Sequence, residues 1–261
     1  LERIESVASH WRADTPVAHF NSMLDTKPFT VSSELLEMLK VAELIHHRTE
    51  GAFDVTVAPL VNLWGFGPIE ETRGKIPGDE EIENALASLG QDKLMLLPKS
   101  FFRKTQPDLQ LDLSALAKGY AIDQVAQRLD KLGVLHYLIE LGGELRAKGN
   151  GSKGKGWQVG LEHPQADANA TKIHRVITLT DAAVATSGNY RLAFIDPDTG
   201  QAYSHLIDPR TGRPANHNVS VSVITNSAAV ADAMSTALFV AAPEKAQPIV
   251  RTVGDLTAII T

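Results

Sequence analysis

Hydrophobic side chains that recur every three or four residues predict five helices in this chain. The first covers residues 1–8, where Leu1, Ile4 and Val7 share one face. The second begins after Thr30 or Ser32, either of which can cap it, and continues to Gly51. The remaining three are expected at residues 79–89, from the neighbourhood of residue 114 to a glycine cap at residue 133, and at residues 227–241.

Alternation of apolar and polar positions predicts strands, mostly in the second half of the chain. The segment VSVSVIT alternates without a break, and a Gly142-Gly143 turn joins two strands of a hairpin. We also expect a strand running into Asp112, and loops over residues 14–28 and 203–214. The other strands are expected at residues 93–97, 101–105, 157–163, 175–180, 182–187 and 256–261. The pattern predicts an α+β protein of mixed helices and antiparallel-rich sheets.

Composition narrows the function classes. The chain has 261 residues, 25 Lys and Arg against 31 Asp and Glu, and a net charge of −6, so nucleic acid is not an expected partner. It has no cysteine, which excludes disulfides and thiolate ligands. No apolar run approaches the ~18 residues that a membrane helix needs. The chain opens at Leu1 without Met, so we expect a processed or trimmed sequence from which a signal peptide or lipid anchor was removed.

Two segments carry candidate chemistry at helix positions. Asp232 and Thr236 lie four residues apart, so their oxygens project from one helix face and suit a magnesium ion; a capping Asp with a back-bonded Thr is the alternative. Asp112 precedes a helix whose first turn contains Lys118 and Gly119, an arrangement that fits either an anion site or a plain capped helix.

A loop and several aromatic residues add further candidates. His205 lies in YSHLIDPRTGRP and can accept a proton from a hydroxyl, although such a histidine is more commonly a hydrogen-bonded surface residue. The other eight histidines have no metal-ligand spacing. No serine-hydrolase elbow or dinucleotide fingerprint occurs. Four aromatic residues either stack on a planar ring or fill the core, with the core favoured: Trp11, Phe53, Trp64 and Phe66.

Six ordered segments resemble the ApbE family of FAD:protein FMN transferases over almost the whole chain. They are GAFDVTVAPLVNLWGFGP, DLSALAKGYAID, IELGGELRAKG, ATSGNYR, YSHLIDPRTGRP and VADAMSTALFV. The resemblance implies one ApbE-like domain over residues 1–261, with two interleaved lobes and a cofactor cleft between them. It also implies a magnesium-dependent transfer of FMN from FAD to a Ser or Thr hydroxyl of a target flavoprotein, with release of AMP.

The same resemblance assigns roles to individual residues. His205 is the expected general base. The main-chain oxygen of Ala115 and the side chains of Asp232 and Thr236 are the expected magnesium ligands. The expected FAD contacts are Trp11, Ala52, Phe53, Asp54, Asp112, Lys118 and Ile207.

Two departures from the family pattern and two alternatives remain. The family's first strand is missing, and Ser235 stands where some relatives carry an acidic ligand, so fewer protein carboxylates are expected on the metal. Some relatives also carry Glu in place of Lys118. The alternatives are a magnesium-dependent FAD pyrophosphatase and a non-catalytic FAD-binding protein.

Family members are often periplasmic and lipid-anchored to the inner membrane, and their usual targets are subunits of membrane redox complexes and electron-transfer flavoproteins.

Overall fold

The computed structural model describes residues 1–98, 100–163, 173–188, 193–197, 199–217 and 219–261. It divides into two compact units, each built from two separate stretches of chain. Unit 1 comprises Leu1–Ala117 and Leu192–Asn216, and unit 2 comprises Lys118–Arg191 and His217–Thr261. This interleaving, with mixed helices and antiparallel sheets in the units, confirms the predicted fold class. The single domain over residues 1–261 and the cleft stay predictions.

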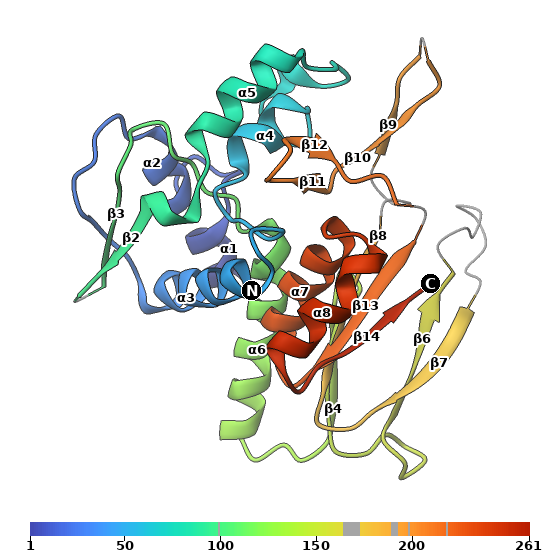
Figure 1. Ribbon diagram of the computed structural model, residues 1–261. Helices are drawn as coiled ribbons and strands as arrows, with labels where there is room; N and C mark the ends of the chain where they lie inside the picture. The colour runs from blue at the N-terminus through green and yellow to red at the C-terminus, as the bar shows by residue number, and fades with distance from the viewer. Residues whose placement is uncertain (99, 164–172, 189–192, 198, 218) are drawn as a thin grey trace. The chain divides into compact units, whose positions relative to one another are not determined.

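Unit 1 is mainly helical (Figure 1). Its small antiparallel sheet has the strand order β1-β3-β2, and two short hairpins, β9-β10 and β11-β12, come from its second stretch of chain. The helices are α1 (Glu2–Ala8), α2 (Pro16–Ser22), α3 (Ser33–Arg48), α4 (Ala58–Leu63), η1 (Glu70–Thr72), α5 (Asp79–Ser88) and η2 (Gln91–Lys93). The strands are β1 (Phe29–Thr30), β2 (Leu94–Leu97), β3 (Phe101–Lys104), β9 (Ala193–Ile195), β10 (Ala202–Ser204), β11 (Ile207–Asp208) and β12 (Arg213–Pro214).

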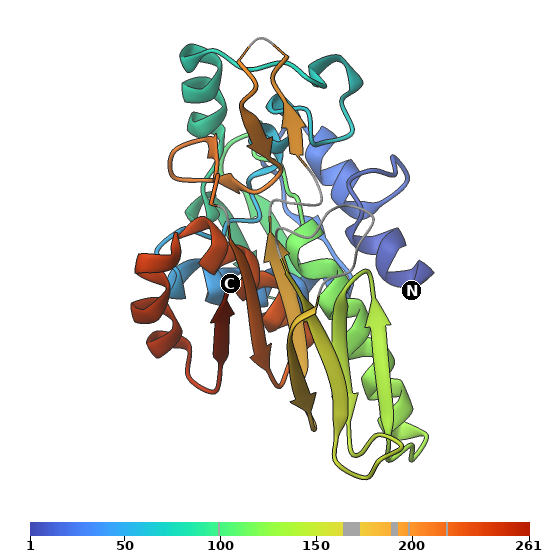
Figure 2. The ribbon, with the colours of Figure 1, turned by 90° about the vertical axis from the view of Figure 1, so that its right-hand side faces the viewer.

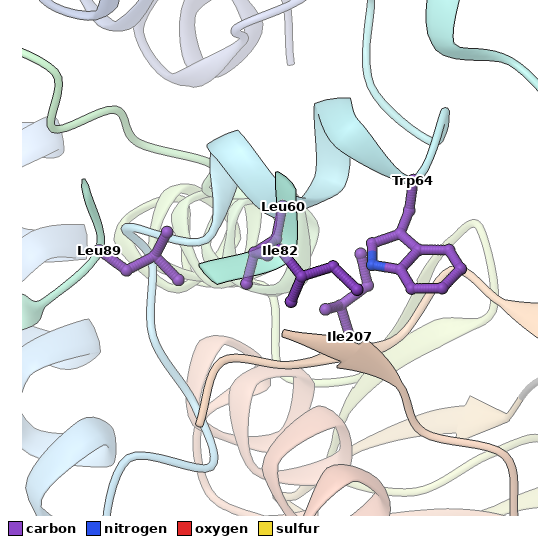
Figure 3. Close-up of a cluster of buried hydrophobic side chains, with 5 residues drawn as sticks. All are labelled: Leu60, Trp64, Ile82, Leu89 and Ile207. Carbon is purple, nitrogen blue, oxygen red and sulfur yellow. The ribbon is translucent and has the colours of Figure 1, made fainter. Parts of the chain in front are cut away.

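A hydrophobic cluster joins the two stretches of unit 1. Figure 3 shows the side chains of Leu60, Trp64, Ile82, Leu89 and Ile207 turned toward one another. The indole nitrogen of Trp64 donates to a backbone carbonyl of the β11-β12 hairpin, at residue 212, over 2.8 Å. The hairpin is thereby fixed to α4 by apolar packing and by a satisfied buried donor.

Unit 2 is built on a five-stranded antiparallel sheet with the strand order β14-β13-β8-β5-β4 (Figure 2). Helices α6 and α7 cover one face and the β6-β7 hairpin covers the other (Figures 1 and 2). Alternation along β8 explains this, because Ala183 packs toward the helices and Val184 toward the hairpin. The strands are β4 (Tyr137–Leu141), β5 (Glu144–Lys148), β6 (Trp157–Glu162), β7 (Ile173–Leu179), β8 (Ala183–Gly188), β13 (Ser220–Thr225) and β14 (Thr257–Ile260).

Three helices complete unit 2: α6 (Ser114–Lys131), which begins in unit 1, α7 (Ala228–Val240) and α8 (Pro243–Val253). In α6 the backbone of Ala115 is non-helical, with φ −86° and ψ 16°. Among the described residues, none of the helices is long and apolar enough to cross a membrane.

The five predicted helices are present, but three helices were missed. The predicted loop over residues 14–28 contains α2, because Thr15 accepts a hydrogen bond from Ala18 N and caps this helix. The others missed are α4 and α8. Each of the three has a proline in its first turn, which is a helix-start signal.

The predicted strand into Asp112 is also wrong. The backbone there bonds to side chains and a loop: Leu111 exchanges two hydrogen bonds with the Asn21 amide, and Asp112 N donates to Val55 O. The predicted 203–214 loop contains β11 and β12. Residue 99, between the strands predicted at 93–97 and 101–105, and residues 189–191 of ATSGNYR lie outside the described part of the chain.

Candidate functional site

Helix α7 places the two candidate metal ligands one turn apart. Its sequence is rich in alanine, and Ser227 caps it by accepting a hydrogen bond from Val230 N. Asp232 is 4% exposed, and its Oδ2 accepts from Gly119 N at 3.1 Å. The Thr236 hydroxyl is 3.1 Å from the Ser187 hydroxyl. The capping alternative for Asp232 is therefore wrong, since its carboxylate bonds to another helix.

A second carboxylate, Asp123 on α6, fixes the start of α7. It accepts hydrogen bonds from the Ser227 hydroxyl at 2.7 Å, Ala228 N at 2.9 Å and Ala229 N at 3.1 Å. Its Oδ1 also forms an ion pair with Arg146. These contacts satisfy donors that a helix N-terminus leaves without intrahelical partners. They therefore determine where the Asp232 side chain lies relative to α6.

Lys118 forms an ion pair that reaches from α6 to the β4-β5 hairpin. Its Nζ donates to Glu144 Oε1 at 2.6 Å; the lysine side chain is 46% exposed and that of Glu144 only 6%. The other oxygen, Glu144 Oε2, is buried and has no hydrogen-bond partner among the residues that the structure describes. Burial raises the pKa of the Asp232 carboxyl well above its ordinary value, and the charge of Glu144 raises this pKa further. The buried Glu144 carboxylate thus pairs with Lys118, while Asp232 bonds to the backbone of the next residue.

This donor set fits a hard divalent cation. Asp232 and Thr236 place two side-chain oxygens on one helix face, and Glu144 Oε2 is a further buried oxygen without a hydrogen-bond partner among the described residues. No group of three or more His, Asp or Glu side chains with metal-binding geometry occurs among the described residues. A cation here would therefore take part of its coordination from water or phosphate.

In unit 1, Asp112 lies beside a histidine that the sequence analysis did not single out. His10 Nδ1 is 3.4 Å from Asp112 Oδ1, and both side chains are less than a tenth exposed. Ser114 N donates to the same carboxylate oxygen at 2.8 Å, which agrees with Asp112 as the cap of α6. Trp11 is 52% exposed, so its assignment to the core is wrong. Its role beside FAD stays a prediction.

Asp54 is 8% exposed and organises its own loop. Its Oδ1 accepts from Thr56 N at 2.7 Å and from the Thr56 hydroxyl at 2.6 Å, and Oδ2 accepts from Gln91 N at 3.2 Å. His46 Nδ1 lies 3.5 Å from Oδ2. The preceding Ala52 and Phe53 are buried. The carboxylate therefore has a structural function here, and the FAD contacts of these three residues stay predictions.

His205 lies between two ordered elements, β10 and β11. Its ring is partly exposed and packs edge-on against Phe66, with the ring centres 6.3 Å apart. Ile207 is buried in the cluster of Figure 3. The hairpin turn that follows is closed by an ion pair in which Arg210 Nε and Nη2 donate to the two oxygens of Asp208. His205 thus lies directly before a hairpin that is anchored in the hydrophobic cluster through Ile207.

Comparison with known proteins identifies the family. The ApbE family matches residues 1–260. The chain belongs to the ApbE family. It is 40% identical over 250 residues to the FAD:protein FMN transferase of Vibrio cholerae, covering 95% of this chain and 73% of that protein. It is 37% identical over 265 residues to the enzyme of the same name from Escherichia coli strain K12, covering 100% and 74%.

Solved structures agree with this assignment. The flavin transferase ApbE from Vibrio cholerae superimposes with a TM-score of 0.89 at 38% identity, covering 100% of this chain and 81% of that one. The ApbE protein from Thermotoga maritima gives 0.88 at 32% identity, covering 99% and 82%. Both matches confirm the ApbE fold.

The predicted site residues divide between the units. Unit 1 contains Trp11, Ala52, Phe53, Asp54, Asp112, Ala115, His205 and Ile207, and unit 2 contains Lys118, Asp232 and Thr236. Sequence reasoning missed Asp123 and Glu144 as contributors to the site. Both lie in segments that carried the resemblance, DLSALAKGYAID and IELGGELRAKG. In each segment, a charged residue beside strongly apolar positions could have indicated that the residue contributes to the site.

Proposed function

We propose that this protein transfers FMN from FAD to a Ser or Thr hydroxyl of a target flavoprotein, in a magnesium-dependent reaction that releases AMP. The observation that carries the proposal is the match over the whole chain to proteins named FAD:protein FMN transferase. The structure supports it with the oxygen ligands Asp232 and Thr236 on one face of α7.

In the proposed reaction, the acceptor hydroxyl oxygen forms a bond to the phosphorus of the FMN half of FAD. The bond from that phosphorus to the bridging oxygen breaks, and AMP leaves with this oxygen. His205 accepts the hydroxyl proton. Lys118 binds a phosphate oxygen, while Asp232, Thr236 and the Ala115 carbonyl would hold the magnesium ion. Bound magnesium neutralises charge that develops on the pyrophosphate.

The target and the location are part of the same proposal. We infer that the acceptor is a flavoprotein subunit of a membrane redox complex and that the protein acts in the periplasm, anchored to the inner membrane by a lipidated N-terminus. The family resemblance supports both. Fractionation of cells that express the full-length gene checks the location, because recovery in the cytosolic fraction would contradict it.

The deciding experiment measures AMP release from FAD by the purified protein in magnesium, with and without a peptide that contains an acceptor Thr. Intact mass of the peptide follows. A gain of one FMN together with AMP supports the transferase. AMP and free FMN without peptide modification would make the protein an FAD pyrophosphatase, and retention of FAD with no AMP would make it a binding protein.

A further inference from the structure

We propose that Glu144 supplies the second carboxylate of the divalent-cation site on α7, and that Lys118 competes with the cation for it. The inference deepens the proposed function and rests on the cation site proposed there. It assigns to Glu144, on the β4-β5 hairpin, a second negative charge beside that of Asp232, which is the one carboxylate in the α7 sequence.

The buried unpaired oxygen is the first reason. A carboxylate removed from water without full compensation is strongly unfavourable, so buried carboxylates are normally paired or bind metal. Glu144 is 4% exposed, Lys118 satisfies only its Oε1, and Oε2 has no partner within the described part of the chain. The oxygen therefore has the capacity to accept a cation or a metal-bound water.

The second reason is the position of both carboxylates at the same turn of α6. Glu144 contacts Lys118 Nζ, and Asp232 contacts the amide of the next residue, Gly119. When all three side chains are ionised, the cluster has one more negative than positive charge. A divalent cation balances the charge of both carboxylates, whereas the single ammonium balances only one.

The half-exposed ammonium of Lys118 is the group that can leave Glu144 when a cation binds. Lys118 holds Glu144 at 2.6 Å and is 46% exposed, so it can turn away from the hairpin while Glu144 stays buried. A cation that binds to Glu144 and Asp232 then weakens the hold on Lys118 and frees its ammonium for an anionic ligand such as a phosphate.

The test is a titration of Mn²⁺, followed by electron paramagnetic resonance, on the complete purified protein without FAD. Glu144→Gln is expected to raise the dissociation constant of Mn²⁺ by about 10- to 100-fold, the usual cost of losing a charged neighbour of a metal ligand. Glu144→Asp, which keeps the charge, recovers most of the affinity. Lys118→Gln removes the competing ammonium and lowers the dissociation constant below that of the parent.

The two Gln variants are expected to change the dissociation constant of Mn²⁺ in opposite directions, which distinguishes this role from a purely structural ion pair. If Glu144 only held Lys118 in place, both Gln variants would change Mn²⁺ binding in the same way, and that result overturns the proposal. Asp130→Asn is the matched control, because Asp130 forms a 2.7 Å ion pair with Lys148 in the same unit. It leaves Mn²⁺ binding unchanged. If Glu144→Gln does not fold, the Lys118→Gln titration still decides.

Failure of this inference is distinguishable from failure of the proposed function. A parent protein that releases AMP in magnesium, combined with equal Mn²⁺ affinity in the parent and Glu144→Gln, overturns the role of Glu144 alone. A parent that binds Mn²⁺ through Glu144 but releases no AMP supports the inference and contradicts the transferase. A parent that binds no Mn²⁺ overturns the inference.

Discussion

Replacing Asp123 by alanine should destabilise unit 2 more than any loss of a surface ion pair. The substitution removes the acceptor for Ala228 N, Ala229 N and the Ser227 hydroxyl, and it leaves Arg146 without its partner. The Asp123 side chain is 10% exposed, so water does not replace these bonds freely. The first turn of α7 therefore loses its attachment to α6.

The magnitude follows from the contacts. Each stranded buried donor costs about 1–3 kcal/mol. A fully buried ion pair that loses one partner costs about 3–5 kcal/mol, but the Arg146 side chain is 24% exposed and its share is smaller. Taking the three donors at the lower end of their range and adding a partial share for Arg146 gives a loss of about 3–5 kcal/mol in the free energy of unfolding. At about 2–4 °C per kcal/mol for a chain of this size, the Tm falls by about 6–20 °C.

Thermal unfolding followed by circular dichroism measures the effect. Adding Arg146→Met to Asp123→Ala should restore part of the lost stability, because it removes the unpaired charge. Asp130→Asn is again the control, and its Tm stays close to that of the parent because both partners of that pair are more than a third exposed. The reasoning is refuted if Asp123→Ala lowers the Tm no more than Asp130→Asn does.

Four further outcomes are expected. Asp232→Ala abolishes magnesium-dependent AMP release, and undiminished activity would contradict its role as a ligand. His205→Ala leaves FAD binding intact, measured by flavin fluorescence, and slows transfer at least about a hundredfold; loss of binding instead would make it a pocket residue. Gly119→Ala lowers the Tm and weakens Mn²⁺ binding, since its Cβ would lie 2.2 Å from Ala228 O; parental values would contradict the close approach. Burial lowers the pKa of Lys104, so the unfolded state holds more protons than the folded state between that lowered value and 10.5. The unfolding free energy of the parent, relative to that of Lys104→Met, therefore rises with pH across this window. A difference that does not change with pH would exclude the shift.

Local patterns account for the helices that the sequence predicted. Helix α3 combines a Ser32 cap with an apolar stripe, and α7 combines a Ser227 cap with an alanine-rich run, so both are specified by residues a few positions apart. The Asp232 and Thr236 pair was predictable for the same reason, because a spacing of four residues places two side chains on one helix face.

Contacts between distant segments account for what the sequence did not predict. Glu144 meets Lys118 across 26 residues, and Asp123 meets Ser227 across 104. Residues 109–113 fail to form a strand because the Asn21 amide, some 90 residues away, takes the hydrogen bonds that a neighbouring strand would have taken. Periodicity carries no information about such partners, so only the structure could assign them.

The six residues from Lys118 to Asp123 carry three different physical requirements. Lys118 supplies a charge to Glu144, Gly119 supplies the absence of a side chain where the α7 backbone approaches, and Asp123 supplies acceptors for the α7 N-terminus. Substitutions at these three positions should therefore have different effects on cation binding and on the Tm. Lys118→Gln tightens cation binding but lowers the Tm of the metal-free protein, because the buried Glu144 loses its ion-pair partner. Asp123→Ala lowers the Tm, and Gly119→Ala weakens both stability and cation binding. If all three variants only lowered the Tm, the segment would be a packing element, and the cation site on α7 would not depend on it.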